Sequence, residues 1–215
     1  MGSPRSKVEV KGFEARHYDR LMDLITLGQY PKYLERIIAS MNIQPGDAIL
    51  DLGSGTGRNM CIMERYAGPT GRLVGVDIGE EMLAQARERC KHLPHVSFLK
   101  HRIEEPLPFE NEFDHVTISF VLHGFEDEDK EKIIENAYRA LKPGGTFWVL
   151  DYNEFDLQAK PFFIRFLFTR VECPLAAEFV ALDLKGMLSR HGFTDFREDT
   201  YAWGYIRLLA ARKNP

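Results

Sequence analysis

Three glycines at alternate positions, Gly53, Gly55 and Gly57, follow a short apolar run that contains Asp51. A second apolar run ends at Asp77, twenty residues after the last of these glycines. Glycine tolerates positive φ angles, so such a loop can turn sharply and let a ligand approach the main chain. An acid after the second run can accept hydrogen bonds from both hydroxyls of a ribose. The order strand, glycine turn, helix, strand, acid therefore predicts a nucleotide-binding βαβ unit.

The spacing of the glycines distinguishes between nucleotides. The dinucleotide fingerprint G-x-G-x-x-G requires a third glycine at position 58, where this chain has Arg58. The observed D-x-G-x-G-x-G pattern resembles motif I of the class I S-adenosylmethionine-dependent methyltransferases. In that family the acid follows the second strand, as Asp77 does here. A tight strand-to-helix turn that binds no ligand is the alternative, and the later matching segments disfavour it.

Composition bounds the class of protein. The 215 residues suit one domain, and 44% hydrophobic with 28% charged residues is a globular composition. With a net charge of −4, the protein has no overall positive potential that would attract nucleic acid. The sequence has no apolar run of about 18 residues, as a transmembrane helix needs, and residues 1–7 lack the apolar region of a secretory signal. We therefore expect no transmembrane helix and no secretory signal, and the reduced cysteines described next predict a cytoplasmic protein.

The cysteines do not indicate a metal site or a disulfide framework. Cys61, Cys90 and Cys173 are odd in number and lie far apart in the sequence. They match no zinc spacing, so the expectation is three reduced thiols and no bound metal.

Hydrophobic periodicity and turn residues predict alternating strands and helices. Strands are expected at 48–52, 72–77, 96–99, 114–121, 146–150, 194–200 and 203–212, and helices at 31–42, from about 57, from about 79, and at 128–141 and 177–190. This alternation predicts a parallel sheet that is covered on both faces. The chain is thus expected to form an α/β, Rossmann-like, doubly wound domain.

The nearest subgroup resembles the quinone-biosynthesis C-methyltransferases and related small-molecule methyltransferases. The match to the methyltransferase family covers about residues 48–151 in order. Residues 18–21, Y-D-R-L, resemble the Y-D motif that precedes the core in this subgroup, and residues 139–145, R-A-L-K-P-G-G, resemble its turn before strand five. That turn occurs in many small-molecule methyltransferases, so it indicates the fold and does not identify the substrate.

The resemblance implies a seven-stranded, mostly parallel sheet of order 3-2-1-4-5-7-6, with strand seven antiparallel. One domain is expected over residues 1–215. Within it we expect an N-terminal helical cap at 1–45 and a cofactor-binding core at 46–151. A lid segment and the C-terminal strands follow at 152–215.

The resemblance also implies the cofactor, S-adenosyl-L-methionine, and its contacts. The main chain at Gly53, Ser54 and Gly55 would pass under the methionine part. Asp51 would orient the amino group of the cofactor, and Asp77 would bind the ribose hydroxyls. The other implied contacts are Gly57 in the loop, Ile78 and Met82 beside the adenine, Arg102 and Ile103 near it, and Ser119 and Phe120 near the methionine end.

One segment departs from the family pattern. Many relatives carry G-D-A after strand three, where the acid accepts from the adenine amino group. The matching residues here are Arg102, Ile103 and Glu104, and arginine has no acceptor. Either Glu104 or a main-chain carbonyl replaces that contact, or adenine is recognised more loosely.

Methyl transfer makes modest demands on the protein. It must hold a nucleophile in line with the methyl group and exclude water, and a general base is needed only if the nucleophile must lose a proton. His123, after strand four, is the best-placed candidate base, and Tyr18 is a candidate to close over the cofactor. The alternative for His123 is ordinary packing or a structural hydrogen bond. Asp151 and Tyr152, which end strand five, are candidates to line the acceptor pocket or are simply polar loop residues.

Residues 160–171 are densely aromatic. Three interpretations stay open: a helix buried over the sheet, a lid that lines an apolar acceptor site, and peripheral contact with a membrane.

The predicted function is methyl transfer to a small, partly apolar acceptor, quinone-like or lipid-like. The alternatives are a catalytically inactive cofactor-binding scaffold and an NAD-dependent oxidoreductase. Carbon, oxygen and nitrogen stay open as the methylated atom, as does an arsenic-like acceptor, which no cysteine cluster supports. The sequence does not indicate the oligomeric state.

Overall fold

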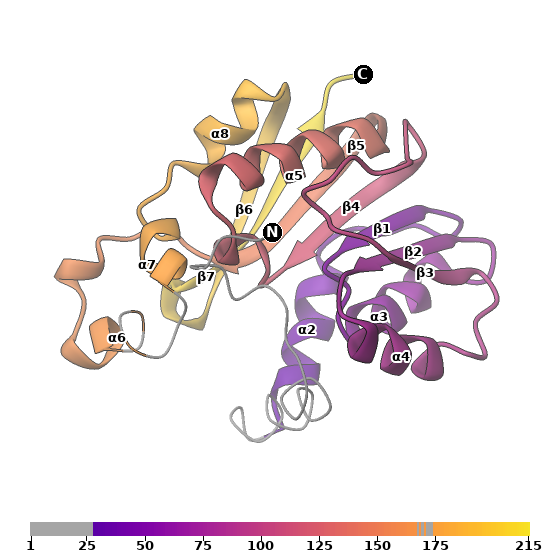
Figure 1. Cartoon of the computed structure of the whole chain (residues 1–215), viewed down its shortest axis with the longest axis horizontal. Coiled ribbons are helices and arrows are strands. Elements are labelled where there is room, and N and C mark those ends of the chain that lie inside the picture. The colour runs from indigo at the N-terminus through magenta and orange to yellow at the C-terminus, as the bar shows by residue number, and fades with distance from the viewer. Residues whose placement is uncertain (1–27, 167, 169, 171–173) are drawn as a thin grey trace.

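A computed structural model describes residues 28–166, 168, 170 and 174–215. These residues form a seven-stranded sheet with helices packed on both faces (Figure 1). The strand order is β3-β2-β1-β4-β5-β7-β6, and β7 runs antiparallel to both of its neighbours. The doubly wound α/β fold, its strand order and the antiparallel seventh strand are thereby confirmed.

The elements alternate along the chain as the sequence predicts. The strands are β1 (Ala48–Leu52), β2 (Arg72–Asp77), β3 (Val96–Lys100), β4 (Phe113–Ser119), β5 (Leu141–Tyr152), β6 (Phe193–Tyr201) and β7 (Ile206–Lys213). The α-helices are α2 (Tyr30–Ala39), α3 (Arg58–Ala67), α4 (Glu80–Arg89), α5 (Asp127–Ala140), α6 (Phe162–Phe166), α7 (Pro174–Phe179) and α8 (Leu184–Arg190). The short 3-10 turns among the described residues are η1 (Leu122–Gly124), η2 (Leu157–Ala159) and η4 (Ala202–Gly204).

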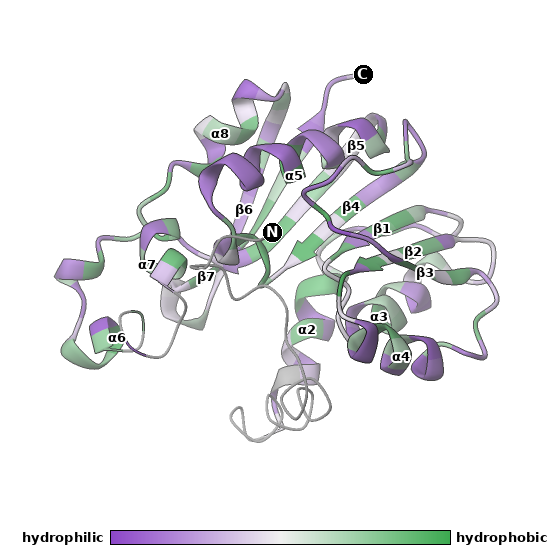
Figure 2. Ribbon diagram, viewed as in Figure 1, coloured by the Kyte–Doolittle hydropathy of each residue, from purple (hydrophilic) through white to green (hydrophobic). Residues whose placement is uncertain are grey.

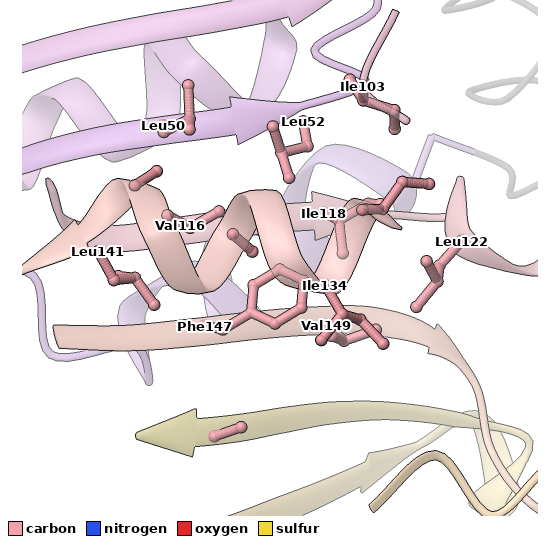
Figure 3. Close-up of a cluster of buried hydrophobic side chains, with 14 of the residues drawn as sticks. Leu50, Leu52, Ile103, Val116, Ile118, Leu122, Ile134, Leu141, Phe147 and Val149 are labelled. Atoms are coloured by element: carbon pink, nitrogen blue, oxygen red, sulfur yellow. The ribbon is translucent and has the colours of Figure 1, made fainter. Parts of the chain in front are cut away.

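Two hydrophobic clusters hold the layers together. Alternate residues of a strand point to opposite faces, so Ile49 packs with α2 and α3 while Leu50 packs with α5 and α8. Figure 3 shows the second cluster, in which Ile134 of α5 lies beside Phe147 and Val149 of β5. The strands are largely hydrophobic, whereas α4 and α5 carry many hydrophilic residues (Figure 2). Because both faces of the sheet are buried, the positions of the strand ends are fixed. The loops that carry the polar residues begin at these strand ends.

Several predicted boundaries were wrong. The seventh strand begins at Ile206 rather than 203, because residues 202–204 form the turn η4, and the first predicted helix ends at Ala39 rather than 42. The helix expected at 177–190 is two helices, because Asp183 caps α8 by accepting from the Gly186 N–H at 2.8 Å. The fourth strand ends at Ser119 rather than 121, since Phe120 adopts a left-handed φ of 54°. The fifth strand begins at Leu141, directly after α5, instead of 146.

The aromatic segment is not a helix buried over the sheet. Within it, α6 leaves Phe162, Phe163 and Phe166 exposed, so the first of the three interpretations is wrong for these side chains. Phe168 is buried instead, in a small cluster with residues of α7. The segment therefore has an inner side that packs and an outer side that faces solvent.

Two of the three cysteines meet in space. Cys61 on α3 and Cys90 after α4 are free thiols whose Sγ atoms lie 2.9 Å apart. The hydrogen bond from Cys90 lowers the pKa of the Cys61 thiol to about 7. Cys173 lies outside the described residues.

In the part of the chain that the structure describes, no helix has the length and apolar composition to cross a bilayer.

Candidate functional site

The glycine loop between β1 and α3 has the conformation that its residues predict. Gly53, Gly55 and Gly57 have φ angles of 74°, 52° and 73°. A β-carbon on Gly53 would lie 2.7 Å from the Val121 side chain, and one on Gly57 would lie 3.0 Å from Ala86. A β-carbon on Gly55 would meet nothing within 4 Å. The outer two glycines are thus required by packing, and the central one borders open space.

The Asp77 carboxylate ties this loop to the start of α4. Its Oδ2 accepts from the Gly55 N–H at 2.8 Å, and its Oδ1 accepts from the Gly79 N–H at 2.7 Å. Met82, in the first turn of α4, is buried, whereas Ile78 is partly exposed. These residues surround the same edge of the sheet, at the carboxyl ends of β1 and β2, where ligands bind in open α/β sheets.

Asp51 is a buried carboxyl group beneath the loop. The Thr117 hydroxyl donates to its Oδ1 at 2.7 Å. Burial raises the pKa of Asp51 to about 7. The hydrogen bond from Thr117 lowers this pKa, whereas the negative charge of Asp77 raises it. The side chain therefore changes charge near neutral pH, and a cation placed beside it would favour its ionised form.

The raised pKa makes protein stability depend on pH. Between about pH 4 and 7 the folded chain keeps a proton on Asp51 that the unfolded chain releases, so stability should fall as pH rises, by at most about 1.4 kcal/mol per pH unit. Above the folded pKa the loss should level off. Asp51→Asn retains an acceptor for Thr117 and removes the titration, so its urea-unfolding free energy should change less over this range. Parallel curves for the variant and the parent protein would contradict this prediction.

Ser54 lies against the sheet. Its Oγ is buried without a hydrogen-bond partner among the described residues. A β-carbon on Gly75 of β2 would lie 2.8 Å from the Ser54 side chain, so the glycine in β2 makes room for it. Only the main chain of Ser54 is therefore placed to meet a ligand above the loop.

The segment after β3 is held from inside the protein. Arg102 forms an ion pair with Glu104, the residue considered as a substitute for the missing acid. Ile103 is buried, and its carbonyl accepts from Asn136 Nδ2 of α5 at 2.9 Å. Arg102, Ile103 and Glu104 therefore have structural partners in this segment, and their contact with adenine stays a prediction.

A histidine–aspartate pair lies at the carboxyl ends of β4 and β5. His123 Nδ1 lies 2.8 Å from Oδ1 of Asp151, whose side chain is 1% exposed. The same carboxylate accepts from the His123 N–H at 3.2 Å and the Tyr152 N–H at 2.8 Å. Because the carboxylate is the acceptor, Nδ1 carries the proton and Nε2 is the basic nitrogen. The pair has the arrangement of an oriented general base.

Aromatic rings surround this pair. The Tyr152 ring centroid is 5.0 Å from that of His123, and the Phe179 ring is 6.3 Å away. Tyr152 in turn contacts Phe120 and Phe168, at 6.4 and 4.8 Å. We call these four rings the aromatic wall. Such a wall lowers the access of water to the histidine and favours a flat apolar ligand.

The segment after β4 joins the histidine to the glycine loop. Ser119 ends β4, and Phe120 follows with its N–H donated to the Leu150 carbonyl at 2.8 Å. Val121 packs against the position of Gly53, two residues before His123. The structure thus brings several of the residues named from the sequence to one edge of the sheet. They are the glycine-loop residues, Asp51, Asp77 and His123. Tyr18 lies outside the described residues.

Sequence reasoning named His123 and Asp151 separately and missed their pairing. The available signal was their position, since His123 follows β4 and Asp151 lies at the carboxyl end of β5, the neighbouring parallel strand. The described residues contain no cluster of three or more histidine, cysteine or acidic side chains that could hold a metal ion.

Comparison with known proteins identifies the family. The model of the ubiE/COQ5 methyltransferase family matches residues 7–190. The "Ubiquinone/menaquinone biosynthesis C-methyltransferase UbiE" of Enterobacter sp. (strain 638) is 36% identical over 143 residues, which are 65% of this chain and 56% of that protein. The protein of the same name from Escherichia coli O1:K1 / APEC is 35% identical over the same length. The match thus spans little more than half the length of these curated relatives.

A solved structure agrees with the fold. A SAM-dependent methyltransferase from Aquifex aeolicus superposes with a TM-score of 0.66 at 21% identity, over 83% of this chain and 88% of that one. The family match also sets aside the NAD-dependent oxidoreductase, which Arg58 already disfavoured. This chain belongs to the ubiE/COQ5 methyltransferase family.

Proposed function

We propose that the protein transfers a methyl group from S-adenosylmethionine, the cofactor of its family, to a ring carbon of a reduced, quinone-like acceptor. The observation that carries this proposal is the His123–Asp151 pair, which lies within the aromatic wall and beside the glycine loop. The names of the curated relatives, which are quinone-pathway C-methyltransferases, support the same acceptor class.

The residues at the sheet edge fit the cofactor. The open space above Gly55 admits a ligand against the main chain, and the Asp77 carboxylate lies at that point to accept from ribose hydroxyls. Asp51 supplies a buried carboxylate for the amino group. When bound, the cofactor supplies an electrophilic methyl group on a sulfonium. The protein therefore has to supply the binding groups, the orientation and the proton acceptor.

His123 is the proposed general base. A hydroquinone carbon is a stronger nucleophile when its hydroxyl has lost a proton, and His123 Nε2 takes that proton as the carbon–methyl bond forms. S-adenosylhomocysteine is the leaving group. The ring carbon then loses its own proton to water, the aromatic system is restored, and the proton held on His123 returns to the hydroxyl oxygen. Asp151 acts as a positioning residue, because it fixes the tautomer and stabilises the imidazolium that forms. The aromatic wall excludes water and holds the ring flat against the histidine.

The division of the chain follows from these roles. We assign residues 46–151 to cofactor binding, 152–215 to a lid segment and the last strands, and 1–45 to an N-terminal cap within the same domain. In the lid, Phe168 and Phe179 contact Tyr152 and His123, respectively, and thus complete the aromatic wall.

A scaffold that binds the cofactor without turnover is the second candidate. The intact glycine loop and Asp77 suit binding in either case. The histidine–aspartate pair favours an enzyme, because its two groups have the arrangement of a general base and its orienting acid.

Transfer of a labelled methyl group tests the proposal. The acceptors are a hydroquinone with an unsubstituted ring carbon, its oxidised quinone, and a small polar amine. We expect label on a ring carbon of the hydroquinone alone, since the oxidised ring has no hydroxyl proton to lose. Preferential methylation of the amine would overturn the acceptor class. Cofactor binding by calorimetry without transfer to any acceptor would favour the scaffold.

A further inference from the structure

Exposed large hydrophobic side chains gather at one end of the molecule. Among the described residues five are exposed: Tyr66 at 37%, Phe162 at 80%, Phe163 at 67%, Phe166 at 52% and Trp203 at 98%. Only Tyr66, on α3, lies elsewhere; the other four belong to α6 and to η4, the turn between β6 and β7. We call these four side chains the aromatic tip. Scattered exposed hydrophobic residues are common, but a group of four aromatic rings indicates an interaction surface.

The two parts of the aromatic tip are packed together through their neighbours. Asn153 Nδ2 donates to the Gly204 carbonyl at 3.0 Å, and the rings of Phe155 and Tyr205 meet edge to face at 5.3 Å. Lys160 Nζ lies 5.2 Å and 5.4 Å from the centroids of these two rings. The turn that carries Trp203 therefore rests on the segment that leads into α6. In Figure 1, α6 lies at the end of the molecule away from α3 and α4.

The inner side of α6 faces the candidate site. Ile164 packs against the buried cluster of Phe168, Leu175, Ala176 and Val180, and Tyr152 of the aromatic wall packs against the same cluster. The rings of Phe162 and Phe166 lie 6.4 Å apart and are exposed. The α6 part of the aromatic tip thus adjoins the buried cluster that contains Phe168 of the aromatic wall.

The charge of this segment differs from that of the whole chain. Residues 157–171 contain Lys160, Arg165 and Arg170 and no acid, although the net charge of the chain is −4. The two acids that precede the segment are exposed, but each has a partner. Glu154 forms an ion pair with Arg207 at 2.8 Å, and Asp156 accepts from the Gln158 N–H. Aromatic rings interspersed with cations are complementary to an anionic lipid surface, where rings insert at headgroup depth and cations meet phosphates.

We propose that the aromatic tip docks the protein peripherally on an anionic lipid bilayer. A stable protein interface takes about 20–30 residues a side, whereas four exposed rings and three cations suit shallow insertion into headgroups. This inference goes beyond the proposed function and does not depend on it. If both hold, the bilayer delivers an acceptor with an apolar tail beside the aromatic wall.

Vesicle sedimentation tests the proposal without cofactor or acceptor, so its outcome is independent of the methyl-transfer assay. The probes are vesicles of phosphatidylcholine mixed with phosphatidylglycerol, and vesicles of phosphatidylcholine alone. We expect the protein to sediment with the mixed vesicles and to be released by salt. Phe162→Ser and Trp203→Ser should each weaken the partition coefficient about tenfold, because each removes an inserted ring. Both side chains are exposed, so the variants should keep the thermal midpoint of the parent.

Matched controls separate docking from general stickiness. Tyr66→Ser removes an exposed ring on α3 and should leave the partition unchanged. Arg170→Gln should weaken binding to mixed vesicles about fivefold and leave pure phosphatidylcholine unaffected, whereas Lys91→Gln on the far side should change neither. No binding by the parent protein would overturn the proposal. An effect of Tyr66→Ser equal to that of Trp203→Ser would also overturn it, as would a dimer by light scattering that these tip variants dissociate.

Discussion

Replacing His123 by alanine is expected to lower kcat for the hydroquinone acceptor by about 10²- to 10⁴-fold, the usual contribution of a general base. The affinity for the cofactor, measured by calorimetry, should change little, because the histidine acts on the acceptor. Asp151→Asn should lower kcat as well, since the amide no longer fixes the tautomer with Nδ1 protonated. It should also move the pH profile of kcat, which a merely structural role of Asp151 would leave in place.

His95→Ala is the matched control. His95 also pairs with a carboxylate, Glu64, at 3.1 Å, and its side chain is 15% exposed against 14% for His123. It precedes β3, at the opposite edge of the sheet from the glycine loop. Equal losses of kcat in the two alanine variants would show that the effect is one of stability, and unchanged kcat in His123→Ala would remove this residue from the mechanism.

Asp77→Asn is expected to weaken cofactor binding about 5- to 150-fold, which corresponds to roughly 1–3 kcal/mol. The substitution keeps the size of the side chain but removes its charge and one acceptor. In the structure both carboxylate oxygens accept main-chain N–H groups, from Gly55 and Gly79. An asparagine accepts through one oxygen only, so it should loosen the glycine loop in addition to losing a ribose contact.

Asp114→Asn controls for the general effect of such a change. Asp114 accepts from the Ala48 N–H at 2.9 Å and pairs with Lys142, but at the opposite edge of the sheet. Its variant should lose stability and keep its affinity for the cofactor in isothermal titration. If Asp77→Asn binds as tightly as the parent protein, this aspartate does not hold the ribose.

The parts of the fold that sequence reasoning predicted well are those set by local rules. Positive φ at Gly55 and an acid at the end of β2 are visible in residue types alone, and β1 and β2 have the predicted bounds. The failures depend on tertiary context. Phe120 adopts a left-handed φ because the chain must leave the sheet there, and no residue type announces that. Asp183 divides residues 177–190 into two helices because its side chain caps the second one. The helical spacing of the apolar residues hid this cap, so the sequence pattern predicted a single helix.

The candidate site shows the same division. Asp51 and Asp77 follow from their place in the glycine motif. The pairing of His123 with Asp151 spans 28 positions and depends on β4 and β5 being neighbours, so it needed the strand order as well as the residues. The outward direction of Phe162 and Phe163 could not be predicted, since their segment is apolar on nearly all sides and a helical pattern does not say which side packs.

The position of β7 has a consequence for the order of folding during synthesis. β7 follows β6 in the chain but lies between β5 and β6 in the sheet, and β6 pairs with no other described strand. Until residues 206–213 leave the ribosome, β5 is therefore an edge strand of 12 residues with one row of main-chain groups unpaired. Long edges of this kind invite pairing with other chains. The nascent protein therefore exposes this edge to pairing with other chains in the interval between completing β5 and completing β7.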